Sequence, residues 1–172
     1  MKKLLLGIAA VCLAGFTFAQ DAPLWMRHSV ISPDGTTIAF TYKGDIYTVP
    51  VAGGRAMQIT TNPAYDTAPV WSPDSKRIAF ASDRMGSQDV YIVAKDGGEP
   101  RRLTTHSGSE TPLAFTDAGH VLFSAGIMPS AEAVVFPSNG QFNQVYRVSV
   151  EGGRPTMISS MPMECISINK EG

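Results

Sequence analysis

Cysteine is nearly absent from this chain, since its 172 residues include only Cys12 and Cys165. Cys12 lies in an apolar N-terminal stretch that we expect to be cleaved off, so no internal disulfide can form in what remains. The folded part must then be stabilised by packing alone. No basic neighbourhood surrounds Cys165 in the sequence, so we expect a small buried residue there and not a reactive thiol.

An excess of positive charge is also absent. The chain has 14 Lys and Arg against 15 Asp and Glu, a formal net charge of −1. Binding to nucleic acid or to an anionic membrane surface requires a basic face, so we expect no nucleic-acid partner.

No apolar run is long enough to span a membrane. The longest, Leu4 to Phe18, has 15 residues, whereas a spanning helix needs about 20. It follows Lys2 and Lys3 and ends with small residues at Thr17 and Ala19. This pattern predicts a signal peptide at residues 1–19, and hence an exported bacterial protein, periplasmic or secreted, with no membrane anchor after cleavage.

Recognisable catalytic and metal-binding patterns are missing as well. The three histidines, His28, His106 and His120, have no close spacing suited to metal ligands. No serine lies in a Gly-x-Ser-x-Gly pattern, the signature of a nucleophile elbow. We therefore expect surface or turn histidines, no catalytic residue, no metal and no cofactor in this chain.

What the sequence does contain is a repeat. Residues 29–40 (SVISPDGTTIAF) return as residues 69–80 (PVWSPDSKRIAF), and a more divergent third copy covers residues 112–123 (PLAFTDAGHVLF). The spacings are 40 and 43 residues. Self-similarity at this period is typical of repeat folds, in which each unit is one supersecondary element that buries its apolar face against its neighbours.

The second copy predicts four short strands. Apolar and β-branched residues occupy 69–72, 77–82, 89–94 and 101–105. A Pro-Asp turn separates the first two strands and a Gly-Gly hairpin separates the last two. Four antiparallel strands in each unit of about 40 residues are typical of a β-propeller blade.

We therefore predict an all-β fold, an open and incomplete β-propeller segment over residues 20–172. Three four-stranded blades are expected at about 25–65, 66–109 and 110–162, followed by the first strand of a fourth at 163–172. Propellers close with four to eight blades, so we expect further blades downstream.

The second copy also carries a specific resemblance. Its Trp-Ser-Pro-Asp-Ser, Ile-Ala-Phe, Asp-Val-Tyr, Gly-Gly and Leu-Thr-Thr segments, within residues 71–105, are similar to the Pro-Asp variant of the WD40-like blade. TolB propellers, tricorn-type proteases and some prolyl-oligopeptidase-like enzymes share that blade. A signal peptide followed directly by Trp25 and the first repeat most resembles the exported tricorn-like serine peptidases, because TolB usually carries an α/β domain before its propeller.

The resemblance implies an N-terminal propeller that gates or docks peptides or proteins and leaves catalysis to a downstream C-terminal protease domain. Two alternatives remain: a non-enzymatic, TolB-like periplasmic protein-binding propeller, or the propeller of a prolyl-oligopeptidase-like hydrolase. Fold analogy alone does not choose among them.

Residues that recur between copies are expected to be structural. Turn geometry explains Asp34, Asp74 and the two Gly-Gly pairs, and Trp71 is expected in the core of the second blade; the glycines are Gly53, Gly54, Gly97 and Gly98.

The copies differ most between the second and third strands, where the third copy carries an insertion. Its Met128, Phe136 and Phe142 are candidates to contact a partner, a substrate or a neighbouring domain.

Charged residues in the links between copies allow two interpretations. Asp66 and Glu110 occupy matching places, so each either caps the following blade or contributes to a ring of carboxylates at the channel mouth. Asp83 and Arg84 are expected to form a loop ion pair of little energetic weight.

Overall fold

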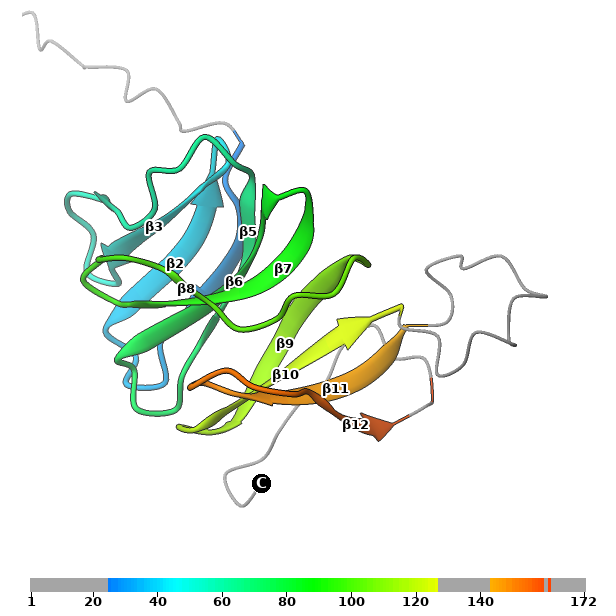
Figure 1. The fold of residues 1–172 in the computed structure, drawn as a ribbon. Helices are drawn as coiled ribbons and strands as arrows, with labels where there is room; N and C mark the ends of the chain where they lie inside the picture. The colour runs from blue at the N-terminus through cyan, green and yellow to red at the C-terminus, as the bar shows by residue number, and fades with distance from the viewer. Residues whose placement is uncertain (1–24, 127–142, 160, 162–172) are drawn as a thin grey trace, which may run out of the picture.

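The computed structural model describes residues 25–126, 143–159 and 161, and these form three antiparallel sheets of four strands each (Figure 1). The predicted signal peptide at residues 1–19 and the predicted start of a fourth blade at 163–172 lie outside the described residues. Within the described part, no helix is long and apolar enough to cross a membrane. The predicted all-β, open segment of three four-stranded blades is confirmed.

Each sheet is a meander of consecutive strands in the order of the sequence. The first blade contains β1 (Arg27–Ile31), β2 (Thr37–Tyr42), β3 (Asp45–Pro50) and β4 (Met57–Gln58). The second contains β5 (Asp66–Trp71), β6 (Arg77–Met85), β7 (Ser87–Ala94) and β8 (Arg101–Arg102). The third contains β9 (Glu110–Asp117), β10 (His120–Ala125), β11 (Gln144–Ser149) and β12 (Thr156–Ser159).

A stacked aromatic pair recurs at the same register in every blade. A phenylalanine on the second strand lies opposite a tyrosine on the third, with ring centroids 5.7–5.9 Å apart. These pairs are Phe40–Tyr47, Phe80–Tyr91 and Phe123–Tyr146. Cross-strand aromatic contacts of this kind stabilise a sheet beyond the area they bury, and they fix the register in which the repeats superimpose.

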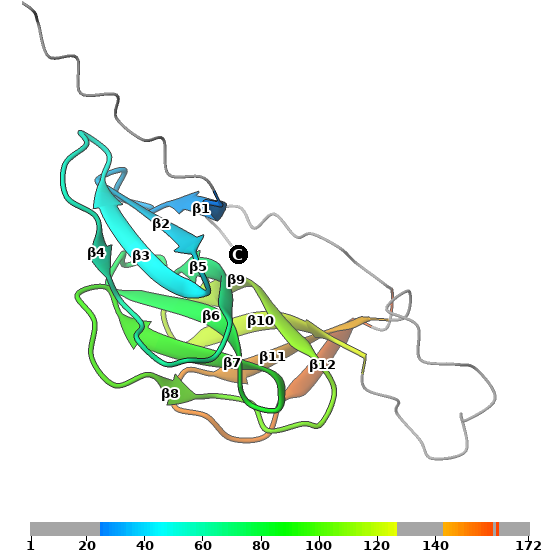
Figure 2. The ribbon, with the colours of Figure 1, turned by 90° about the horizontal axis from the view of Figure 1, so that it is seen from above.

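The blades stack face to face and bury one apolar layer at each junction (Figure 2). Between the first and second blades this layer includes Ile46, Trp71 and Phe80. Between the second and third it includes Ile92, Phe115 and Phe123. No blade could bury these side chains alone, so the repeat and the stacking depend on each other.

The first turn of each of the first two blades is held by an aspartate. In the second blade the Ser72 hydroxyl donates to Asp74 Oδ1 at 2.6 Å, and the Lys76 N–H donates to the same oxygen at 3.2 Å. Asp34 accepts the same bonds from Ser32 and Thr36 in the first blade. The recurrence of the Pro-Asp pair thus has a local cause in turn geometry.

The third blade makes this turn with one residue fewer. Trp71 pairs with Ile78 in the second blade, whereas Phe115 pairs with Val121 in the third. Phe115 therefore takes the place of Trp71, although an ungapped alignment of the repeats puts Ala114 there. That alignment is wrong by one residue because the shorter turn and a bulge in β9 compensate each other.

Candidate functional site

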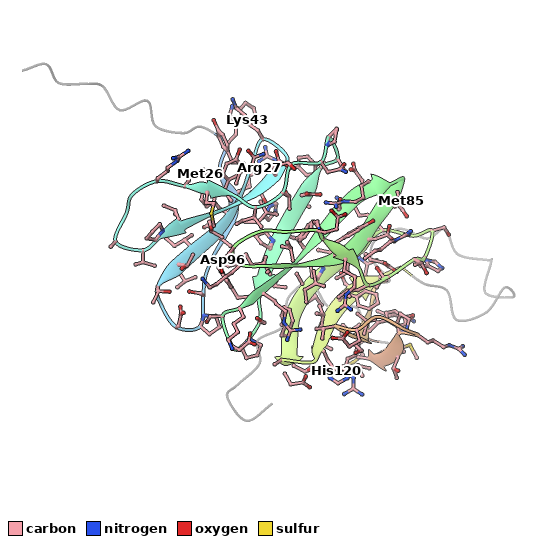
Figure 3. The ribbon with its side chains drawn as sticks, turned by 60° about the vertical axis from the view of Figure 1, so that its left-hand side comes forward. Met26, Arg27, Lys43, Met85, Asp96 and His120 are labelled. Carbon is pink, nitrogen blue, oxygen red and sulfur yellow. The ribbon has the colours of Figure 1, made fainter. Side chains whose placement is uncertain are left out.

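The hairpins between the second and third strands of the first two blades lie on the same side of the molecule. Figure 3 shows Lys43 of the β2–β3 turn and Met85 of the β6–β7 turn toward one end, with His120 of the β9–β10 turn toward the other. Contacts between blades agree: the Asp34 N–H donates to the Ser75 hydroxyl at 3.1 Å, which joins the first turns of two neighbouring blades. Loops of matching type therefore share a face, as alternating strand directions require.

A groove of about 400 Å³ opens on the second–third hairpin side, where the first blade meets the link to the second. It is lined by Trp25, Arg27, Thr41, Lys43, Gly44 and Tyr65. Trp25 and Tyr65 are 69% and 41% exposed, so two aromatic rings are available to a ligand. Binding sites commonly combine such apolar walls with a few placed polar groups.

Glycine at position 44 shapes one side of this groove. Gly44 has φ +91°, and its carbonyl accepts a hydrogen bond from the Asp66 N–H at 2.7 Å, so the link lies directly against the hairpin. A Cβ there would lie 3.4 Å from Tyr65 Cδ2. The positive φ is the stronger constraint, because side chains other than glycine adopt it only with strain.

The groove carries two positive charges that no carboxylate neutralises within the described part of the chain. Arg27 Cζ lies 5.8 Å from the centroid of the Trp25 ring, and Lys43 Nζ lies 5.3 Å from that of Tyr42. Neither cation forms an ion pair with a described residue. Cation–π contacts hold the two side chains in place and leave their charge available.

Nearby carboxylates are already engaged. Asp66 binds Arg84, Asp83 Oδ1 accepts the Tyr65 N–H at 2.8 Å, and Asp45 accepts from Gln58 Nε2 at 3.0 Å. Burial is the main cause that raises the pKa of Asp45 above its ordinary 3.8. The two cations of the groove are therefore available to a ligand, because the neighbouring carboxylates already bind other groups.

A buried hydroxyl adds a polar group to the groove. Thr41 lines it, is only 2% exposed, and its Oγ1 has no hydrogen-bond partner among the described residues. Leaving a buried hydroxyl unpaired costs free energy, about 1–3 kcal/mol.

Two buried ion pairs lie deeper on the same side. Arg84 Nη2 donates to both oxygens of Asp66 at 3.1 and 3.0 Å, and its guanidinium lies 4.4 Å from the centroid of the Tyr91 ring. Arg102 Nη2 lies 2.8 Å from Asp89 Oδ2. Asp66 and Asp89 are both fully buried.

The expected pair between Asp83 and Arg84 is therefore wrong. Neighbouring residues on a strand point to opposite faces, so Arg84 reaches back to Asp66 across the β5–β6 pairing, while Asp83 caps the link at Tyr65. Full burial of Asp66 and Glu110 also rules out a solvent-facing ring made by these two carboxylates.

The other predicted residues lie in the core, in turns or in a loop outside the described residues. Trp71 is 8% exposed and its Nε1 donates to the Val30 carbonyl at 3.2 Å. The Gly-Gly turns have positive φ throughout: +85° and +127° at Gly53 and Gly54, +92° and +119° at Gly97 and Gly98. The candidate loop residues Met128, Phe136 and Phe142 lie outside the described residues.

Histidines and acids form no metal centre in the described part of the chain. No group of three or more His, Cys, Asp or Glu side chains is placed to hold an ion there. His28 Nδ1 lies 3.0 Å from the Thr67 hydroxyl, and His120 Nδ1 lies 3.0 Å from Asp117.

Comparison with known proteins decides the family. A family model described as the tricorn protease N-terminal beta propeller domain matches residues 23–172. This chain belongs to that family. The tricorn-family propeller described here thus accounts for nearly the whole sequence.

The relatives are considerably longer than this chain. Tricorn protease homolog 1 of Streptomyces coelicolor is 35% identical over 102 residues, which is 59% of this chain and 9% of that protein. The uncharacterized peptidase YuxL of Bacillus subtilis is 30% identical over 129 residues, 74% of this chain and 20% of that protein. The tricorn-family propeller therefore spans a tenth to a fifth of the curated relatives it matches.

A solved TolB structure supports the fold. The putative TolB from Agrobacterium tumefaciens superimposes with a TM-score of 0.61 at 23% identity, covering 74% of this chain and 46% of that one. At this identity the likeness concerns the fold alone.

Sequence reasoning missed the groove. Its residues come from the start of β1 and the residues before it, from the β2–β3 hairpin and from the link, and none of them belongs to the recurring positions of the repeat. The only sequence signal was the pair of cations Arg27 and Lys43 on either side of the first repeat motif, and the β1–β2 pairing is what brings them together.

Proposed function

We propose that this chain is the docking part of an exported tricorn-like peptidase and is not itself catalytic. The family match and the two peptidase relatives support a propeller that works with a protease domain elsewhere in the protein. On this proposal further blades close the propeller downstream, and peptides or proteins are its ligands.

The groove at Arg27, Thr41 and Lys43 is the observation that carries the proposal. Two cations without an acidic partner among the described residues, together with two exposed aromatic rings, fit a carboxylate that lies beside an apolar side chain. Charge-assisted hydrogen bonds to a carboxylate are stronger than neutral ones. The preferred ligand is therefore an acidic peptide segment with an adjacent aromatic residue.

Peptide binding to the full protein tests this function. A fluorescent peptide with adjacent Phe and Glu is titrated by anisotropy, beside the same peptide with Gln in place of Glu. Arg27→Gln together with Lys43→Gln should weaken binding of the acidic peptide by about tenfold or more, or about 1.4 kcal/mol, and should barely change the neutral one.

Lys95→Gln is the matched control, because this exposed cation already pairs with Asp96 at 2.9 Å, away from the groove. Equal loss in the groove and control variants would indicate nonspecific charge attraction. Equal affinity for both peptides would contradict the docking function.

Export is part of the proposal. The charged start, apolar run and small residues at 17–19 support cleavage before Gln20. N-terminal sequencing of the protein recovered from outside the cytoplasm should begin at Gln20; an intact Met1 would contradict export by this signal.

A TolB-like binding module is the alternative, because the putative TolB structure has the same fold and the described residues show no catalytic group that would separate the two functions. The two functions differ in what the full protein does to a bound peptide. Cleavage that is lost when a downstream catalytic serine is replaced supports the peptidase, whereas binding without cleavage supports the module.

A further inference from the structure

Glu110, the first residue of β9, is a buried acidic residue that forms no ion pair in the described part of the chain. Its side chain is fully buried at the junction between the second and third blades, and neither Oε1 nor Oε2 has a hydrogen-bond partner among the described residues. Buried carboxylates are rare unless they are paired. Glu110 does not line the groove proposed for ligand docking.

The preceding junction shows what Glu110 lacks. Asp66 occupies the same register in the second blade, since Asp66 pairs with Ser82 as Glu110 pairs with Ala125. Asp66 receives Arg84, whose Nε is held by the Ser82 hydroxyl at 2.8 Å.

The third blade offers no such cation. Ala125 replaces Ser82, and Ile127 stands in the sequence where the second blade has Arg84. The sequence from 126 to 143 contains no Lys, Arg or His. The segment equivalent to the one that supplies Arg84 therefore contains no cationic side chain that could pair with Glu110.

The polar side chains near Glu110 include two charged groups that already form an ion pair with each other. Asp89 on β7 and Arg102 on β8 are paired with each other, and Thr104 follows β8. Burial is the main cause that raises the pKa of Glu110, to about 7, and the Asp89 carboxylate adds to the rise, whereas Thr104 and Arg102 oppose it.

Other charged groups on the strands packed against β9 are occupied or distant. Asp66 of β5 and Arg84 of β6 bind each other, and His120 of β10 lies at the opposite end of the β9–β10 hairpin, beside Asp117. Among the described residues, a charge on Glu110 would therefore be buried near Asp89, and the nearby Arg102 is already paired with Asp89.

We propose that Glu110 is a protonation switch for the junction between the second and third blades. When it is neutral, β9 stays packed against β7; when it ionises, the buried charge repels Asp89 and draws water into the junction, which loosens it. The third blade is thereby held less firmly at alkaline pH.

The direction follows from linkage. A carboxyl whose pKa is higher in the folded protein than its ordinary value of 4.5 binds a proton more tightly when folded. Folding is therefore favoured below about pH 4.5 relative to higher pH, the advantage declines as the pH rises toward about 7, and it is gone above that value.

Two measurements on the full protein test the switch. Infrared difference spectra should show a protonated carboxylic acid that disappears with a midpoint near pH 7 and is absent from Glu110→Gln. Amides of β9 should exchange about tenfold faster at pH 8 than at pH 6 after correction for intrinsic rates, and Glu110→Gln should abolish that difference.

Asp66→Asn is the matched control, since it removes the equivalent carboxyl of the other junction and should leave the infrared band near pH 7 unchanged. Titration of the band near pH 4.5 would overturn the proposal. Identical exchange at the two pH values in the wild type would overturn it too, and that result needs no variant to fold.

Discussion

At the scale of single residues, the blade junctions depend on side chains that bury apolar surface and still satisfy their polar atoms. Trp71 buries its indole between the first two blades and donates its N–H to the Val30 carbonyl of the blade before. The residues at the same register in the other two blades differ in burial. Phe115 of the third blade is 5% exposed, because it packs at the junction with the second blade. Ile31 of the first blade is 61% exposed, because no described blade covers that side.

Replacing Trp71 with alanine should therefore lower the free energy of unfolding by about 3–5 kcal/mol, through lost burial and the cavity that remains. Denaturant unfolding measures the change. Ile31→Ala is the matched control and should cost less than about 1 kcal/mol, because an exposed side chain loses little burial. Similar losses for both variants would contradict the assignment of Trp71 to a junction.

At the scale of elements, the first turn of a blade is a local unit whose hydrogen bonds favour an ionised aspartate. The Ser72 hydroxyl is the main cause that lowers the pKa of Asp74, with the Lys76 N–H adding to it and burial opposing it. The aspartate pKa is thus below its ordinary 3.8 in the folded state. The stability it contributes is complete above about pH 3.8 and is lost as the pH falls through the lowered value.

Asp74→Asn should accordingly make the melting temperature less sensitive to acid between about pH 4 and pH 2 than it is in the wild type. Ser72→Ala removes the largest of these bonds and should reduce the acid sensitivity in the same direction. Thermal unfolding by circular dichroism at the two pH values gives the comparison. Unchanged acid sensitivity in both variants would show that the turn does not depend on the charged aspartate.

At the scale of the whole molecule, the described blades leave apolar side chains exposed on the first and the third blade. Ile31 is exposed on the inner strand of the first blade, and Met157 and Ile158 of β12 are 47% and 52% exposed on the outermost strand of the third. Exposed strand edges and apolar faces favour association with other chains.

Residues 20–172 alone should therefore self-associate, and Ile31→Ser should shift the population toward monomer. Size-exclusion chromatography with light scattering measures the distribution. A wild-type monomer that unfolds cooperatively would instead mean that three blades are stable alone, which would favour the independent binding module over the docking part of a peptidase.

Much of the fold could be predicted from the sequence because it is repeated and local. The spacing of 40 and 43 residues, the Pro-Asp and Gly-Gly turns and the alternating strands determine a meander of four strands without any knowledge of distant contacts. Phe80 and Tyr91 could be assigned to neighbouring strands on that basis. The shift at Phe115 could not, because a shorter turn and a bulge cancel in the sequence count.

Which partner each charged side chain binds was decided by the tertiary structure alone. Arg84 follows Asp83 in the sequence, yet it binds Asp66 on the adjacent strand, and the unneutralised pair of Arg27 and Lys43 exists only because β1 lies beside β2. The isolation of Glu110 likewise depends on which side chains reach one buried point. Periodicity specifies strands and turns because these depend on near neighbours, whereas the partner and the hydration of a charge depend on residues tens of positions away.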